Sequence, residues 1–536
     1  MTAGGKRKVE IYDSTLRDGA QGEGVSFSTE DQTLIVRKLD EFGIDMIEGG
    51  QPASNPKAAE FFRRMRDEPP LRHAQLCAFG STHHPRSTPE KDANVAALLE
   101  AGTHIVTIFG KSWRLHARDV LRVSLKRNLS LIEDTIRFLV GQGREVIYDA
   151  EHFFDGYKDD PGYAMETLLA AQEAGARTIV LCDTNGGTLP DQIYEITSRV
   201  REKLSTPLGI HTHNDIGCAV ANSLMAVAAG ATHIQGTING YGERCGNADL
   251  CSVMPSLKFK LGSSFTAARN LGRLTQLSHY ISEIANQIPR DNQPYVGRSA
   301  FAHKAGMHIH AMEKNPLSFE HIEPSAVGNR RRYLISEVAG RSAIISKATE
   351  LGVSLDKNDP RTAEILQRIK QLEHEGYQFE GAEASLSLIM RRLTERHHPF
   401  FELRGFRVIV ERSPEKGLLS EATVKLNVGD ELEHTAAEGG GPVEALDLAL
   451  RKALEKFYPV LKDVRLTDFK VRILNPGAGT AAKTRVLIES ADKEETWSTV
   501  GVSENIIEAS YMALVDSIEY RLLREEERLK KKEKKK

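Results

Sequence analysis

Short apolar runs alternate with longer amphipathic stretches from residue 9 to about residue 250. The amphipathic stretches, such as Thr29–Phe42 and Pro161–Ala174, have helical periodicity, and several are followed by a glycine that suits a helix C-cap. Eight such units, spaced by roughly thirty residues, predict a TIM (β/α)8 barrel, with a doubly wound open sheet as the alternative. The expected strands are Val9–Thr15, Asp45–Gly50, His73–Gly80, His104–Gly110, Glu145–Phe154, Thr178–Thr184, Leu208–His213 and His233–Asn239.

The pattern changes after about residue 255, where the chain becomes mostly helix-like and irregular. From Pro399 on, strand-like runs at Phe406–Glu411 and Ala422–Val428 precede a helix-like stretch, Val443–Phe457, and a similar order recurs at 484–520. We therefore expect an α/β chain in four parts. These are a TIM barrel (1–282), helical linker subdomains (283–396), a C-terminal α+β domain (397–523) and a charged tail (524–536) that is a frayed helix end or disordered.

The bulk composition is that of a soluble globular protein. The chain has 536 residues, 40% of them hydrophobic and 27% charged, and a formal net charge of −3, which gives no sign of a nucleic-acid partner. No apolar run is long enough to span a bilayer. The first eight residues include basic ones but are not followed by the apolar stretch of a secretory signal. The five cysteines lack metal-type spacing and their odd number argues against a disulfide framework, so we expect a cytoplasmic protein.

A His-x-His pair, His211 and His213, ends the seventh expected strand. Side chains at positions i and i+2 of a strand point to the same face, so the two imidazoles can hold one divalent cation. In isolation such a pair is often an ordinary pair of surface histidines. Its place at the carboxyl end of a barrel strand, where TIM-barrel active sites lie, favours a metal site.

Polar residues also follow several other expected strands, at what would be the same mouth of the barrel. Asp18 and Asn247 can each supply an oxygen to the cation, which leaves two octahedral positions for the keto and carboxylate oxygens of a 2-oxo acid. Such nitrogen and oxygen ligands suit Mg²⁺, Mn²⁺ or Co²⁺, with Zn²⁺ possible. Arg17 would stabilise the developing alkoxide, or else form a salt bridge to a neighbouring acid. Thr184 would donate to the substrate carboxylate, or else cap a helix.

Four motifs together resemble those of the DRE-TIM metallolyases, in the branch of 2-isopropylmalate, homocitrate and citramalate synthases. They are Ser14-Thr-Leu-Arg-Asp-Gly-Ala-Gln21, His211-Thr-His-Asn-Asp215, Gly242-Glu-Arg-Cys-Gly-Asn247 and Ala302-His-Lys-Ala-Gly-Met-His308. The resemblance covers about residues 9 to 520. It implies a Claisen-type condensation of acetyl-CoA with a 2-oxo acid, and Asp18, His211, His213 and Asn247 as metal ligands.

The resemblance also implies roles for further residues. Glu151 and His308 would act together in removing the methyl proton, as catalytic residues beside Arg17, since an imidazole has a pKa near the working pH. The family's His308 segment reaches the active site of a partner subunit, so a homodimer is implied, although a buried structural histidine is the alternative. Gln21 would contact substrate, and Glu243 would lie behind the metal ligands.

The chain most resembles the long citramalate synthases, as in the segment Asp149-Ala-Glu-His-Phe-Phe-Asp-Gly-Tyr157. This implies pyruvate as the acceptor and a role in isoleucine biosynthesis. Gln51 departs from the tryptophan expected there. One methylene changes binding by only about 1–3 kcal/mol in an apolar pocket, so 2-oxoisovalerate and a 2-isopropylmalate synthase stay open as the alternative.

The C-terminal region resembles the regulatory domain of 2-isopropylmalate synthases. The resemblance implies isoleucine as feedback inhibitor, bound by loops containing Gly439, Gly440, Gly441, Gly501 and Ser503. A purely structural dimerisation module is the alternative. An acyl-CoA lyase and a non-catalytic amino-acid sensor are the remaining functional alternatives. The long C-terminal region argues against the lyase, and the complete ligand set argues against the sensor.

Overall fold

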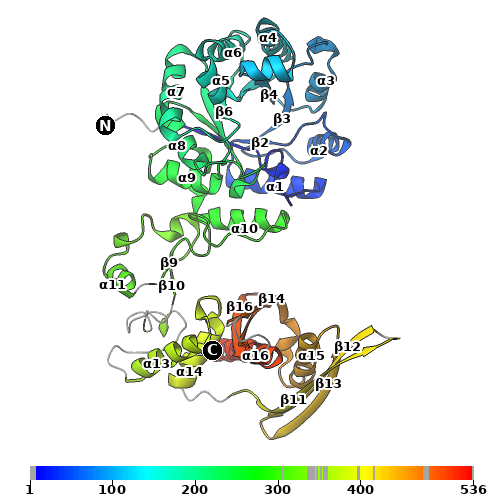
Figure 1. Cartoon of the computed structure of the whole chain (residues 1–536), viewed down its shortest axis with the longest axis vertical. Helices are drawn as coiled ribbons and strands as arrows, with labels where there is room; N and C mark the ends of the chain where they lie inside the picture. The colour runs from blue at the N-terminus through cyan, green and yellow to red at the C-terminus, as the bar shows by residue number, and fades with distance from the viewer. Residues whose placement is uncertain are drawn as a thin grey trace. The chain divides into compact units, whose positions relative to one another are not determined.

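The barrel predicted for the first half of the chain is present in the computed structural model. The structure describes residues 8–304, 306–334, 345, 348–349, 353, 360–394, 399–414, 417–474 and 482–533. Eight parallel strands close into a barrel in chain order, with β1 paired to β8 (Figure 1), so the doubly wound alternative is wrong. The strands are β1 (Glu10–Asp13), β2 (Met46–Glu48), β3 (Gln75–Ser81), β4 (Ile105–Lys111), β5 (Glu145–Glu151), β6 (Thr178–Asp183), β7 (Leu208–Thr212) and β8 (His233–Gly236).

Helices surround the barrel and cover its outer face (Figure 1). The first of them, α1 (Thr29–Phe42), begins at a capping box between Ser28 and Asp31 and ends at Gly43, whose φ of 92° favours glycine. The other helices of this part are α2 (Pro56–Asp67), α3 (Ala93–Glu100), α4 (Leu125–Gly141), α5 (Phe153–Asp159), α6 (Pro161–Glu173), α7 (Pro190–Lys203), α8 (Ala219–Ala229), α9 (Leu250–Phe259) and α10 (Leu274–Ile284).

Two hydrophobic layers hold the barrel together. Strand residues on one face form a small cluster of their own, which includes Tyr12, Met46, Cys77, Ile105 and Ile147. The alternate residues pack with the helices in a much larger core. This division follows from the period of two along each strand, and it fills the barrel interior with side chains.

The chain divides into two compact units. The first comprises residues 1–301 and 321–331, and the second comprises residues 302–320 and 332–536. The second unit contains the short strands β9 (Ala302–His303) and β10 (Arg332–Tyr333) and the helices α11 (Gly306–Lys314), α13 (Pro360–Glu375) and α14 (Glu383–Thr394). The finer domain boundaries drawn from the sequence stay predictions.

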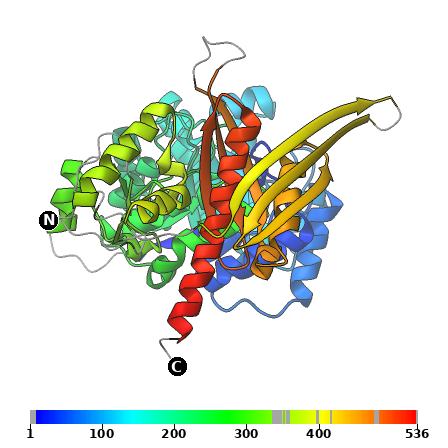
Figure 2. The same ribbon diagram turned by 90° about the horizontal axis from the view of Figure 1, so that it is seen from below.

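The C-terminal region contains two related halves, each an antiparallel three-stranded sheet followed by a helix (Figure 2). The sequence did not predict β13 or β14, because neither strand has a buried residue to produce an apolar alternation. The last helix extends through the charged tail, which begins at residue 524, as far as residue 533. Residues 534–536 lie outside the described part. The elements are β11 (Glu402–Ser413), β12 (Gly417–Val428), β13 (Glu431–Gly439), α15 (Pro442–Leu454), β14 (Arg465–Ile473), β15 (Thr484–Ala491), β16 (Thr496–Ser503) and α16 (Ile506–Glu533).

Candidate metal and active site

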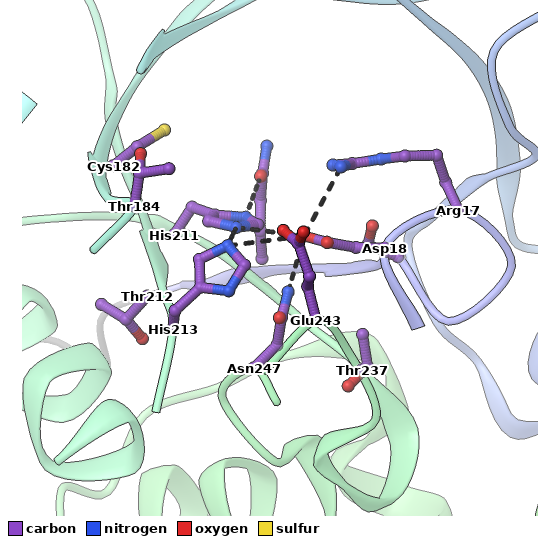
Figure 3. A network of polar contacts seen from close by, with 12 residues as sticks. Arg17, Asp18, Cys182, Thr184, His211, Thr212, His213, Thr237, Glu243 and Asn247 are labelled. Carbon is purple, nitrogen blue, oxygen red and sulfur yellow. Dashed lines mark hydrogen bonds and ion pairs between the residues drawn. The ribbon is translucent and has the colours of Figure 1, made fainter. Parts of the chain in front are cut away.

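The two histidines of the His-x-His pair converge with Asp18 at the carboxyl end of the barrel (Figure 3). Nε2 of His211 lies 3.3 Å from Nε2 of His213 and 3.2 Å from Oδ2 of Asp18. Nε2 of His213 lies 3.9 Å from the same carboxylate oxygen. All three side chains are buried, and their ligand atoms lie within 4.8 Å of one another. The convergence of the two imidazoles is what the spacing of the histidines predicted.

A tight turn after β1 places Asp18 there. The carbonyl of Ser14 accepts hydrogen bonds from the backbone N–H groups of Arg17, at 3.2 Å, and Asp18, at 2.9 Å. The buried carboxylate of Asp13 accepts from both the N–H and the hydroxyl of Thr15, at 3.0 and 2.8 Å, which is an Asx-type turn. Consecutive residues of one turn therefore supply both the carboxylate and the guanidinium of the site.

Asn247 joins the cluster from the loop after β8. Its Nδ2 donates to Oδ2 of Asp18 at 2.7 Å. Glycine is required around it, because a Cβ on Gly242 (φ 155°) would lie 2.3 Å from Oδ1 of Asn247. A Cβ on Gly246 (φ 89°) would lie 2.1 Å from the carbonyl oxygen of Gly240. The glycines of this motif thus let the loop fold tightly enough to bring the amide to the carboxylate.

The residues present fit a divalent cation. Two imidazole nitrogens facing each other beside a carboxylate oxygen match the donor set of such a site. Within the described part of the chain, the buried Oδ1 of Asn247 has no hydrogen-bond partner. This oxygen is the atom with which an asparagine side chain binds a metal ion. Burial and the neighbouring His211 lower the pKa of His213 to about 3, which keeps its imidazole neutral and able to bind a metal. Burial alone would raise the pKa of Asp18, but Arg17 and His211 hold it well below its usual range.

A hydrogen-bonded chain fixes the orientation of His211. Nδ1 of His211 lies 2.8 Å from Oε1 of Gln235, and Nε2 of Gln235 donates to Oδ1 of Asp149 at 2.9 Å. Because the amide nitrogen faces the carboxylate, the amide oxygen faces the imidazole, so Nδ1 of His211 carries the proton. The lone pair of Nε2 is then directed at the cluster. Sequence reasoning missed Gln235, and the pairing of His211 with Gln235 between β7 and β8 is the signal that identifies it.

Arg17 is held by the acid that ends β2. Its Nε donates to Glu48, and its Nη1 lies 3.5 Å from Oδ2 of Asp18. The hydroxyl of Tyr12 donates to Oε2 of the fully buried Glu48 at 2.7 Å. The guanidinium carbon lies 3.9 Å from the centre of the Phe79 ring. The salt bridge weighed as an alternative role for Arg17 is therefore present, and it also fixes the guanidinium at the barrel mouth.

A cavity of about 320 Å³ opens beside Arg17, between the segments that follow β1 and β2. Gln21 is exposed and lines it, as does Gln51. Gln51, where the resemblance implies a tryptophan, therefore shares a cavity with the guanidinium of Arg17.

Glu151 and Thr184 lie at the ends of β5 and β6. The carboxylate of Glu151 forms an ion pair with Lys111, its register neighbour on β4. Sequence reasoning did not assign Lys111 a role. The hydroxyl oxygen of Thr184 accepts from the backbone N–H of His152 at 2.9 Å, which leaves its proton available to another acceptor. His152 is the N-cap residue of α5. The helix that follows Thr184 has Leu189 as its N-cap, so Thr184 does not cap its own helix.

Glu243 is more exposed than the other residues of the cluster. Its side chain is 57% exposed and pairs with Nη1 of Arg244 at 3.3 Å. Arg244 in turn forms two hydrogen bonds with Asp215, at 2.8 and 3.0 Å. Figure 3 shows Glu243 next to the cluster of Asp18, His211 and His213.

His308 lies on α11 in the second unit. It is exposed, and its ring stacks on Phe319 with 4.0 Å between the ring centres. The alternative of a buried structural histidine is therefore wrong. Its part in proton transfer stays a prediction.

The glycines named for the regulatory domain lie beside the helices of its two halves. Gly441 is the N-cap of α15, and the N–H of Gly440 donates to Oε2 of Glu444 at 2.8 Å. Gly439 ends β13, where a Cβ would lie 2.7 Å from the nitrogen of Ala445.

The second half differs in one respect. Gly501 lies inside β16 and not in a loop. Glycine is needed there because a Cβ would lie 2.0 Å from the carbonyl oxygen of Ala509 on α16. Ser503 ends the strand, and its hydroxyl donates to Glu508. Two of the predicted loop glycines thus serve close packing of strand on helix.

Comparison with known proteins agrees with this architecture. The HMGL-like family matches residues 8–281, the homocitrate synthase post-HMGL domain-like family matches 295–377, and the LeuA allosteric (dimerisation) domain matches 380–522. Within the described residues, no helix has the length and apolar character needed to cross a membrane.

Similar proteins match over nearly the whole chain. The (R)-citramalate synthase of Geobacter sulfurreducens is 55% identical over 97% of this chain and 98% of its own. That of Synechocystis sp. is 53% identical over 96% of both chains. The 2-isopropylmalate synthase of Methanocaldococcus jannaschii is more distant, at 31% identity over 95% of this chain and 94% of its own. The chain therefore belongs to the (R)-citramalate synthase family.

Proposed function

We propose that this enzyme condenses acetyl-CoA with pyruvate to give (R)-citramalate and free CoA. The observation that carries the proposal is the similarity to (R)-citramalate synthases over almost the full chain, at up to 55% identity. The buried cluster of Asp18, His211 and His213 gives that similarity a chemical basis.

A divalent cation, Mg²⁺ or Mn²⁺, would be held by Asp18, His211, His213 and the amide oxygen of Asn247. When bound, it polarises a ketone as a Lewis acid. Rotation of the Asn247 amide would present Oδ1 in place of Nδ2 to the Asp18 side of the cluster. Neutral imidazoles and an ionised carboxylate are the protonation states that such a site needs.

The protein's own groups orient the 2-oxo acid. Arg17, fixed by Glu48, stabilises the negative charge that develops on the keto oxygen as the carbon–carbon bond forms. Gln21 and the free hydroxyl proton of Thr184 are hydrogen-bond donors for the acid's carboxylate. Since Gln51 lines the same cavity as Arg17 and Gln21, it contributes to the choice of acid.

Proton removal from the acetyl group needs a base. Glu151 and the partner subunit's copy of the His308 segment act together to take one proton from the methyl carbon. The resulting carbanion equivalent attacks the keto carbon, and the alkoxide takes up a proton. Water then hydrolyses the thioester, which releases CoA and a carboxylate. The match to a dimerisation domain supports the homodimer that this arrangement requires.

A thiol-release assay tests the function. Purified enzyme, Mg²⁺ or Mn²⁺, acetyl-CoA and a panel of 2-oxo acids are mixed, and free CoA is followed. Pyruvate should give the highest kcat/KM, and the product should be (R)-citramalate. Preference for 2-oxoisovalerate would replace this function by 2-isopropylmalate synthesis, and release with none of the acids would contradict it. Feedback inhibition by isoleucine is tested in the same assay.

A further inference from the structure

Two cations lie at the mouth of the barrel, one beside the metal ligands and one beside the proposed base. The first is Arg17, whose partners are described above. The second is Lys111, the last residue of β4, which forms an ion pair with Glu151 at the end of β5. The two residues are register neighbours, and their side chains are only 15% and 24% exposed. The function proposed above gives a role to Arg17 and to Glu151 but none to Lys111.

The alternation of side chains along the strands directs Lys111 into the barrel. On β4, Ile108 belongs to the large core between strands and helices, whereas Ile105 belongs to the small cluster inside the barrel. Lys111 is an even number of residues from Ile105, so its side chain has the interior orientation. Glu151 is likewise an even number of residues from Ile147, which belongs to the same interior cluster on β5. The ammonium and the carboxylate therefore face the same mouth as the metal ligands.

A stacked pair of aromatic rings connects the two cations. The rings of Phe79 on β3 and Phe109 on β4 have centres 5.4 Å apart and an interplanar angle of 20°. The guanidinium carbon of Arg17 lies 3.9 Å from the centre of the Phe79 ring, and Nζ of Lys111 lies 5.2 Å from the centre of the Phe109 ring. Both distances are within the range of cation–π attraction. The apolar pair thus holds one positive group beside each of its rings.

The proposed condensation develops negative charge on two oxygens. One is the keto oxygen of the 2-oxo acid, which Arg17 stabilises. The other is the thioester oxygen of acetyl-CoA. When the base takes a proton from the methyl carbon, the electron pair of the C–H bond becomes a carbon–carbon double bond, and the π pair of the carbonyl moves onto this oxygen. None of the residues assigned above stabilises this enolate oxygen, although such electrostatic stabilisation is usually the largest single contribution to catalysis.

We propose that Lys111 binds the thioester oxygen of acetyl-CoA and stabilises the enolate. This inference rests on the function proposed above. Before the proton transfer, Lys111 is paired with the carboxylate of Glu151. When Glu151 accepts the methyl proton it becomes neutral, and the same negative charge appears on the enolate oxygen. The ammonium therefore has an anionic partner throughout, and it donates a hydrogen bond while it keeps its own protons. The enolate pair then forms the bond to the keto carbon.

Steady-state kinetics of the metal-loaded enzyme with acetyl-CoA and pyruvate give the first test. Lys111→Met removes the charge and should lower kcat by about 100- to 1,000-fold, the usual cost of losing a donor to a developing oxyanion. Lys111→Arg keeps a cation and should recover part of the lost rate. Lys126→Met is the matched control, because it removes the same charge from an exposed position on α4, and its kcat should be unchanged. Melting temperatures confirm that the variants fold.

Binding of carboxymethyl-CoA, a thioether whose carboxylate imitates the enolate, separates this contact from a purely structural pairing with Glu151. The comparison is made in Glu151→Gln, where Lys111 has no carboxylate to hold. Addition of Lys111→Met should weaken binding of the analogue by about ten- to hundredfold, the usual loss for a hydrogen bond to a charged group, and should change the affinity for CoA itself little.

The proposal is overturned if Lys111→Met leaves the affinity for the analogue unchanged in this background, or if Lys111→Met alone keeps full kcat. Failure of the proposed function is a different result. If the unchanged enzyme releases no CoA with any 2-oxo acid, that function is wrong, whereas the titration with carboxymethyl-CoA still decides whether Lys111 contacts the enolate position.

Discussion

Replacement of Gln235 by leucine should weaken metal binding without changing any of the four proposed ligands. The substitution removes the acceptor, 2.8 Å from Nδ1 of His211, that sets the tautomer of this ligand. It also removes the amide N–H of Gln235 that donates a hydrogen bond, at 2.9 Å, to Oδ1 of the buried Asp149. Loss of such a partner behind a metal-binding histidine typically costs 10–100-fold in metal affinity. This corresponds to about 1.4–2.8 kcal/mol.

The assay is Mn²⁺ binding, measured by titration calorimetry or by the loss of the free-ion electron paramagnetic resonance signal. Gln235→Glu keeps an acceptor for the imidazole and should keep most of the affinity. Gln293→Leu is the matched control, because this buried amide also makes two hydrogen bonds, at 3.2 and 3.0 Å, but to Asn239 and Asp249. It should destabilise the fold by a similar amount and leave Mn²⁺ affinity unchanged.

Unchanged Mn²⁺ affinity in Gln235→Leu would refute the reasoning. An equal loss in Gln235→Leu and Gln293→Leu would also do so, since the effect would then be general destabilisation. Denaturant unfolding of both variants without metal gives the free energies needed for the comparison.

Three further results are expected. His213→Ala should abolish CoA release while the circular dichroism spectrum stays the same, and full activity at saturating metal would contradict its role as a ligand. Gly501→Ala should lower the free energy of unfolding by about 1–3 kcal/mol, because its Cβ would lie 2.0 Å from the carbonyl oxygen of Ala509; unchanged chemical unfolding would count against the strand packing described. Burial raises the pKa of Asp13 to about 7, so this carboxyl favours the fold at low pH, and that contribution is lost as the pH rises from about 4 to about 7. Asp13→Asn should flatten this decline in stability across pH 4–7, and an unaltered profile would argue against the shift.

The barrel could be predicted because its strands are buried on both faces. Such strands appear in the sequence as short apolar runs separated by helix-length segments, several of which are followed by a glycine. β13 and β14 could not be recognised in this way, since their side chains are exposed or only partly buried. Their pairing with β12 and β15 depends on contacts that a local pattern does not contain.

The same distinction applies to the site. His211 and His213 are two residues apart on one strand, so their convergence follows from local geometry alone. Gln235 and Glu48 are connected to the site through strand register, and they lie 24 residues from His211 and 31 residues from Arg17 in the sequence. A single sequence shows that such polar residues follow strands, but the partner of each is decided by the closed barrel.

The cavity beside Arg17 draws its two sides from different parts of the chain. The turn that carries Arg17 and Asp18 follows β1, whereas Gln51 belongs to the segment that connects β2 to α2. Exchange of Gln51 therefore leaves the turn with Arg17 and Asp18 unchanged. With the role proposed above for Gln51, an enzyme of this design changes its acceptor through substitutions in one connecting segment, while the residues proposed to form the new bond are inherited intact.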